Sequence, residues 1–169
     1  MINHFKMIEL DTTDCRLLEL LQADASLSNQ ALAERAHTSP ATALRRVRRL
    51  VEAGVIERRI ALLSPAALGA QALNAIVEIT LDRQGAEHLE AFEQRAVNDG
   101  AVQQVWRVSP GPDFVLVVQA ADMADYQALV QRLFTQDANV RNVKAYFAVK
   151  RAKFDPRLRL PPTSTPPAP

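Results

Sequence analysis

A run of arginines is the clearest chemical signal in this chain of 169 residues. Residues 35–59 contain seven Arg and two Glu, a local net charge of +5, whereas the whole chain carries only +1. An arginine side chain can pair bidentately with a guanine edge or with phosphate oxygens. The run lies between Ser39-Pro40, which suits a helix start, and Gly54, which suits a helix end. We therefore predict a basic helix from Pro40 to about Ala53 that can enter the major groove of double-stranded DNA.

Two shorter predicted helices precede this basic helix. Leucines at helical spacing indicate one over about residues 12–23, with Thr12 or Thr13 as its cap, and Ser28 caps a second that ends near residue 36. His37 stands in the turn that follows, and histidine tolerates the left-handed conformation better than most residues. A short helix, a turn and a capped helix with an arginine face make a helix-turn-helix. These neighbours disfavour the alternative that the arginines form only a solvated surface.

The predicted basic helix has an apolar side and an arginine side. At about 100° per residue, the polar side centres on Thr42, Arg45 and Arg49, with Arg46 and Arg48 flanking it. Residues 55–63 then look extended, which would form a wing carrying Arg58 and Arg59. These two arginines either contact phosphates or protect an exposed strand edge from pairing. The apolar side consists of Ala43, Leu44, Val47, Leu50 and Val51.

The second half of the chain alternates between strand and helix patterns. Strands are expected at 72–81, 102–108, 114–120 and 140–149, and helices at 86–97 and after Asp122. The order is β-α-β-β-α-β, a ferredoxin-like arrangement. The fold class is therefore α+β, with a winged helix-turn-helix over 1–63, a linker over 64–71, a ferredoxin-like domain over 72–153 and a proline-rich tail over 154–169. Within 102–108, we expect Val102, Trp106 and Val108 to share one face.

The strand at 114–120 (FVLVVQA) is apolar on both faces. Two helices can cover only one face of the sheet, so the other face needs a partner, and a second copy of the chain is the expected one. Residues 55–71 and the tail are the alternative cover within one chain. A two-fold dimer would imply a DNA site with approximate two-fold symmetry.

Several classes of protein lack support in the sequence. The only cysteine is Cys15, and the three histidines lie far apart, so no metal-ligand spacing occurs. The glycine patterns of nucleophile elbows, P-loops and dinucleotide-binding turns are absent, and we predict no enzymatic activity and no cofactor. No apolar run reaches the roughly 18 residues of a membrane span, and no signal-peptide core occurs near the N-terminus. A cytoplasmic location is expected.

The chain resembles the Lrp/AsnC family of bacterial and archaeal transcription regulators. The resemblance lies in the Leu10-Asp11-x-x-Asp14 start, the Ser28-x-x-x-Leu-Ala pattern, the run from Ser39-Pro40 through Arg-Val-Arg-Arg-Leu to Gly-Val-Ile, and the Leu63-x-Pro-x-x-Leu-Gly linker. It covers about nine-tenths of the chain. It implies a DNA-binding unit, and an effector-binding domain that dimerises and assembles further into a tetramer or octamer. The groove-reading residues it implies are Ser39, Thr42, Arg45 and Arg46, with Arg49 toward the DNA backbone.

The resemblance also implies an effector site, for an amino acid or a related metabolite, between the second and third strands. The family pattern there is G-x-x-D followed by an aromatic residue, and this chain has Pro110 in place of that glycine. Proline lacks an amide donor, so the effector can differ from the usual ones or be absent. Asp113 either pairs with an effector amino group or caps the loop. The implied effector residues are Ser109, Gly111, Asp113 and Phe114.

Two other functions fit the same fold. Sirohaem decarboxylases resemble this architecture, but they would need a basic, histidine-containing pocket in a domain that is here net acidic, with seven basic and ten acidic side chains over 70–150. A ligand-sensing or assembly module without DNA binding is the other, and the arginine face argues against it.

Overall fold

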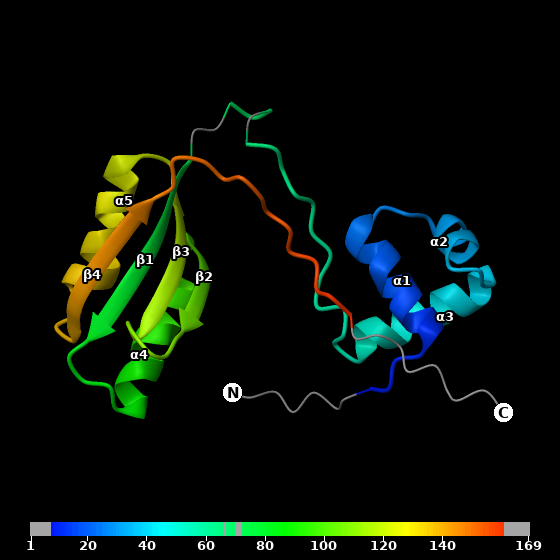
Figure 1. The fold of residues 1–169 in the computed structure, drawn as a ribbon, viewed down its shortest axis with the longest axis horizontal. Helices are drawn as coiled ribbons and strands as arrows, with labels where there is room; N and C mark the ends of the chain where they lie inside the picture. Colours follow the sequence, from blue (N-terminus) through cyan, green and yellow to red (C-terminus); the bar gives the residue numbers. More distant parts are fainter. Residues whose placement is uncertain (1–7, 66, 70–71, 161–169) are drawn as a thin grey trace. The chain divides into compact units, whose positions relative to one another are not determined.

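The computed structural model describes residues 8–65, 67–69 and 72–160. The chain divides into two compact units (Figure 1): one combines Met1–Leu62 with Phe154–Pro169, and the other is Leu63–Lys153. The tail expected to stand apart from both domains therefore groups, in its described part 154–160, with the N-terminal helices. Each unit is described by itself below.

The first unit is built on three helices: α1 (Thr12–Ala23), α2 (Asn29–Arg35) and α3 (Pro40–Glu52). Ser28 and Ser39 cap α2 and α3 as predicted, each accepting a hydrogen bond from an amide three residues on. The cap of α1 was predicted wrongly. Asp11, rather than Thr12 or Thr13, accepts from the Asp14 amide, because a carboxylate at this position can exchange hydrogen bonds with Asp14 in a capping box.

The turns around α3 have the backbone that the sequence indicates. His37 adopts a φ of +55° between α2 and α3, and Gly54 a φ of +72° after α3. The Thr38 amide donates to Ala33 O and the Val55 amide to Leu50 O, which closes both helix ends. The His37 turn therefore sets the start of α3 after α2, and the Gly54 turn sets its end.

The core of this unit is narrow, and one prediction fails because of it. Leu44 and Val51, expected on the buried side of α3, are 42% and 48% exposed. Three short helices offer α3 only one packing stripe, so apolar residues at its margin stay in contact with water. The expected wing at residues 55–63 follows α3 without forming a strand, and its residues 57–63 are exposed. The buried stripe of α3 consists of Ala43, Val47 and Leu50.

The second unit is a four-stranded antiparallel sheet with two helices on one face. Its strands are β1 (Leu73–Leu81), β2 (Val102–Arg107), β3 (Phe114–Ala120) and β4 (Val140–Phe147), in the spatial order β2-β3-β1-β4. The helices are α4 (Ala86–Asn98) and α5 (Met123–Leu129), which continues as a π-helical segment over Val130–Thr135. This confirms the ferredoxin-like order β-α-β-β-α-β.

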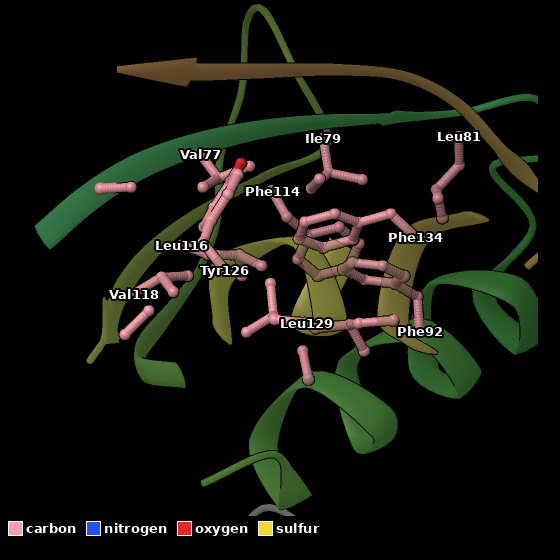
Figure 2. Close-up of a cluster of buried hydrophobic side chains, with 14 residues drawn as sticks. Val77, Ile79, Leu81, Phe92, Phe114, Leu116, Val118, Tyr126, Leu129 and Phe134 are labelled. Atoms are coloured by element: carbon pink, nitrogen blue, oxygen red, sulfur yellow. The ribbon is translucent and has the colours of Figure 1, made fainter. Parts of the chain in front are cut away.

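Both helices send side chains to the same face of the sheet. Figure 2 shows Phe92 of α4 and Leu129 of α5 meeting the side chains of β1 and β3. The Phe92 and Phe114 rings lie 4.9 Å apart, centroid to centroid. The fully buried members of this core include Val77, Ile79, Phe92, Phe114, Leu116, Val118 and Leu129.

Strand β2 presents a different face from the one predicted. A bulge interrupts its pairing with β3 between Val102 and Gln104, so that Val105 lies opposite buried Leu116, and Trp106 lies opposite Val115. One inserted residue exchanges the two faces of a strand. Val102 and Val105 therefore pack on the core, while Trp106 is exposed.

Among the described residues of the second unit, none covers the face of the sheet away from α4 and α5. Central strand β1 leaves Ile76 48% exposed on this face. Ile76 lies opposite Val117 on one neighbouring strand and Tyr146 on the other. Together with Trp106 and Val115, these residues form an apolar surface that we call the open sheet face: Ile76, Trp106, Val115, Val117 and Tyr146.

Candidate nucleic-acid interface and effector loop

The N-terminus of α3 is braced by polar side chains. Ser39 Oγ donates to Thr42 Oγ1 at 2.9 Å and accepts from the Thr42 amide at 3.2 Å. Asn29 Nδ2, on α2, donates to Pro40 O at 2.9 Å. Ser39 is exposed and Thr42 half-buried, so their hydroxyls lie at a fixed helix end near solvent. This is the end of a recognition helix that contacts base edges in helix-turn-helix proteins.

Four arginines around α3 are exposed. Arg45 and Arg48 lie on the helix, and Arg58 and Arg59 follow it. None of the four forms an ion pair within the described part of the chain, whose charged contacts all involve other residues. A guanidinium without an internal partner is available to a phosphate or a base edge. These four side chains place positive charge on the outside of α3 and of the chain that follows it.

Arg46 and Arg49 are engaged differently, because both reach back to α1. Arg46 Nη1 lies 2.6 Å from Asp11 Oδ2 and 2.9 Å from Asp14 Oδ1, and Arg49 Nη2 lies 2.5 Å from Asp14 Oδ2. The Asp14 side chain is only 1% exposed. We call these four residues the α1–α3 charge cluster: Asp11, Asp14, Arg46 and Arg49.

The contacts of the cluster favour the charged forms of Asp11 and Arg46. The hydrogen bond from the Asp14 amide, together with that from Arg46, lowers the pKa of Asp11 below its usual value. The hydrogen bonds to Asp11 and then to Asp14 raise the pKa of Arg46. Arg49 remains 51% exposed despite its contact with Asp14. The buried carboxylate of Asp14 therefore pairs with Arg46 and Arg49, two of the arginines that the sequence analysis assigned to DNA contact.

The α1–α3 charge cluster escaped the sequence analysis. Asp14 entered the sequence prediction only as part of the Leu10-Asp11-x-x-Asp14 start. The available signal was a carboxylate next to the apolar residues Cys15, Leu17 and Leu18. A carboxylate buried among them requires a cationic partner, which would have indicated an ion pair. Among the helices of the unit, α3 carries the most arginines, so it is the natural source of these cationic partners.

The loop between β2 and β3 is shaped by Asp113. Its Oδ2 accepts from the Leu81 amide at 2.7 Å, and its own amide donates to Ile79 O at 2.8 Å. Asp113 therefore ties the loop to β1. This is the role of a loop cap, one of the two roles that the sequence allowed for this residue. Because Pro110 and Pro112 lack an N–H, the amides of Ser109 and Gly111 are the loop's remaining donors.

The structure separates the four predicted effector residues. Ser109 and Gly111 are exposed in the loop, and Gly111 has a φ of +124°, which favours glycine. Phe114 is fully buried, and its ring packs on Phe92 instead of lining a surface site. This part of the prediction is corrected: β3 starts at Phe114, and the alternation of the strand directs that side chain into the core.

Comparisons with known proteins agree with both units. Residues 10–57 match a winged helix-turn-helix DNA-binding family, and residues 74–158 match the Lrp/AsnC ligand binding domain. The leucine-responsive regulatory protein of Rhizobium meliloti is 38% identical over 146 residues, which cover 86% of this chain and 93% of that protein. This chain belongs to the Lrp/AsnC family.

Solved structures of family members have the same fold. An AsnC family transcriptional regulator from Agrobacterium tumefaciens matches with a TM-score of 0.81 and 29% identity, over 89% of this chain and 97% of that one. A transcriptional regulator from Neisseria meningitidis, solved as a complex with L-Met, matches with a TM-score of 0.80 and 27% identity over the same shares.

The protein is therefore a transcriptional regulator with a helix-turn-helix DNA-binding domain and a ligand-binding domain. Its relatives are regulators and not enzymes, which sets aside the sirohaem decarboxylase alternative. Across the described residues, no helix has both the length and the apolar character of a membrane span.

The α1–α3 charge cluster predicts an unequal effect of its two carboxylates. Asp14→Ala should lower the free energy of unfolding of the N-terminal unit by about 3 kcal/mol, because it leaves Arg46 without its buried partner. Asp11→Ala, the matched control on an exposed cap, should cost only about 1 kcal/mol. Urea unfolding followed by circular dichroism measures both. Equal losses for the two variants would show that Asp14 does not organise the cluster.

Proposed function

We propose that the protein is a sequence-specific DNA-binding regulator that acts in the cytoplasm as a dimer or a larger assembly of dimers. The single observation that carries this proposal is the exposed edge of α3. Its braced N-terminus presents Ser39 and Thr42, and Arg45 is exposed and forms no ion pair with the residues that the structure describes. A helix with these side chains at its start can read base edges in the major groove.

The arginines take different roles in this proposal. Arg45 reads a base, while Arg58 and Arg59 contact phosphates beside the groove and add affinity without sequence information. Arg49, half exposed, can contact a phosphate while it stays near Asp14. The reading of a base by Arg46 stays a prediction from the sequence. Since Asp11 and Asp14 both hold Arg46, we assign it mainly to placing α3 against α1.

The open sheet face supports assembly. Ile76, Val115 and Val117 place apolar side chains on central strands, where no helix covers them. Exposed apolar surface of this kind on a central strand is typical of an interface. We propose that a second copy covers it, which gives an isologous dimer. The predicted tetramer or octamer would add further contacts between such dimers.

The loop at 108–113 supports effector binding. Ser109 and Gly111 are exposed there and can offer amide donors to a carboxylate, while Asp113 fixes the loop to β1. Regulators of similar structure from Neisseria meningitidis and Mycobacterium tuberculosis were solved with L-methionine. We propose that an amino acid binds at this loop, beside a subunit interface. The amino acid then favours the form of the assembly for which it has the highest affinity.

A binding series with a DNA duplex from upstream of the protein's own gene tests the proposed DNA contacts. Arg45→Ala should weaken selective binding by about 1–3 kcal/mol, because it removes a base contact. The double variant Arg58→Ala, Arg59→Ala should weaken binding to all sequences and lower the salt slope by about one per lost phosphate contact. Fluorescence anisotropy at several salt concentrations, with a scrambled duplex as competitor, measures both effects.

Arg83→Ala is the control, because it removes an exposed arginine from the other unit and should leave DNA binding unchanged. If Arg45→Ala binds as tightly as the unaltered protein, our assignment of the reading edge is wrong. If no duplex is selected from a random pool, the proposed function itself fails.

Two exposed apolar residues on opposite sides of the second unit provide a test of the dimer. Ile76→Lys places a charge in the open sheet face and should convert the assembly to monomers at micromolar concentration. Val97→Lys, on the solvent side of α4 and 60% exposed, should leave the dimer intact. Sedimentation velocity measures the mass of each species. A monomeric unaltered protein, or an unchanged Ile76→Lys assembly, would contradict the proposed interface.

Thermal unfolding with each of the twenty amino acids at millimolar concentration tests the effector loop. At least one, with methionine the first to try, should raise the midpoint by a few degrees, since a ligand bound only to the folded state stabilises it. Ser109→Glu should abolish that shift by repelling the ligand carboxylate, whereas Gln131→Glu, an equal charge change on an exposed helical position, should not. A shift that persists in Ser109→Glu would place the ligand elsewhere.

A further inference from the structure

The chain returns to its N-terminal helices after completing the sheet. Strand β4 ends at Phe147, and the Ala148 amide still donates to Asn74 O at 2.8 Å. Residues 149–153 are then exposed and belong to no strand or helix. From Phe154 onward the chain groups with α1–α3 in the first unit. We call the described part of this returning chain, residues 154–160, the C-terminal segment.

One glutamine side chain holds the backbone of this segment. Gln22 Nε2 donates to Leu158 O at 3.1 Å, and the Leu158 amide donates to Gln22 Oε1 at 2.6 Å. The side-chain amide thus satisfies both backbone groups of one residue, in the manner of a neighbouring strand. Gln22 is half-buried in the last turn of α1, which restricts its orientation.

The segment has its own local order just before this contact. Asp155 Oδ1 accepts from the Arg157 amide at 3.2 Å, and the Arg157 guanidinium reaches both carboxylate oxygens at 2.9 Å. These contacts fix the backbone on the N-terminal side of Leu158. Less conformational entropy is then lost when Leu158 pairs with Gln22.

This contact gives the N-terminal helices a second attachment to the sheet. The first is the linker that leads into β1, and the second is the chain that leaves β4. Ala75 of β1 lies opposite Phe147 of β4, so both connections leave the same end of the sheet. A second attachment restricts the orientations available to a tethered unit and raises its effective concentration at a matching site.

We propose that the C-terminal segment is a clasp that docks on α1 through Gln22 and restrains the DNA-binding helices. The closed clasp favours simultaneous binding of two half-sites by the two reading helices of a dimer, and the open clasp frees each unit to move independently. This role rests on the proposed DNA-binding function, whereas the existence of the clasp does not.

Hydrogen exchange on the full-length protein tests whether the clasp exists. The Leu158 amide should exchange more slowly than an unprotected amide, and Gln22→Ala should speed its exchange about tenfold, because two hydrogen bonds are lost. Gln30→Ala is the control, since the side chain of this exposed glutamine bonds with Glu34 on its own helix, away from the C-terminal segment. Unprotected Leu158 in the unaltered protein, or exchange unaffected by Gln22→Ala, would overturn the proposal.

Two truncated chains test what the clasp does. The chain 1–160 keeps it and should bind a duplex with two half-sites as the full chain does. The chain 1–153 lacks it and should bind that duplex about tenfold more weakly, while its binding to a single half-site changes little. Equal binding by the two chains would overturn the restraining role. If neither they nor the full chain binds any duplex, the DNA-binding proposal fails, and hydrogen exchange alone decides whether the clasp exists.

Discussion

The arrangement of the DNA-binding unit depends on one buried carboxylate. Asp14 sits at the start of α1 with almost no exposure, and it receives Arg46 and Arg49 from α3. The three helices share a small apolar core, and the charge cluster adds direct contacts between α1 and α3 beside it. A buried charge is tolerated only when paired, and this requirement restricts α3 to positions that bring its arginines to Asp14.

That pairing divides the arginines of α3 between two tasks. Arg46 and Arg49 lie toward α1, while Arg45 and Arg48 remain exposed on the helix. Ser39 caps the same helix and bonds with Thr42, so the residues that we propose read DNA are held by a fixed helix end. In the proposed function, Arg45 contributes to DNA affinity, Arg46 contributes to the stability of the unit, and the half-exposed Arg49 can contribute to both.

The second unit is organised by a sheet that is covered on one side only. Phe92 and Leu129 bring the helices to one face, and Ile76 marks the open face that we propose joins a second copy. The same sheet fixes the effector loop, because Asp113 bonds to the β1 backbone at the end of the β2–β3 connection. The proposed assembly and the proposed effector binding therefore use the same central strands, which is the physical reason to expect each to influence the other.

The sequence by itself determined the elements and their order, because these depend on local signals: Ser28 and Ser39 as caps, Gly54 as a helix end, alternating apolar residues in β1, and the continuous apolar run of β3. Only the tertiary structure decided which side chains meet. The bulge in β2 directs Trp106 away from the core, the buried Asp14 recruits Arg46, and Gln22 captures the backbone of Leu158, 136 residues away in sequence. Spacing along a chain describes a helix or a strand, but ion pairs, strand register and docking depend on groups that only folding brings together.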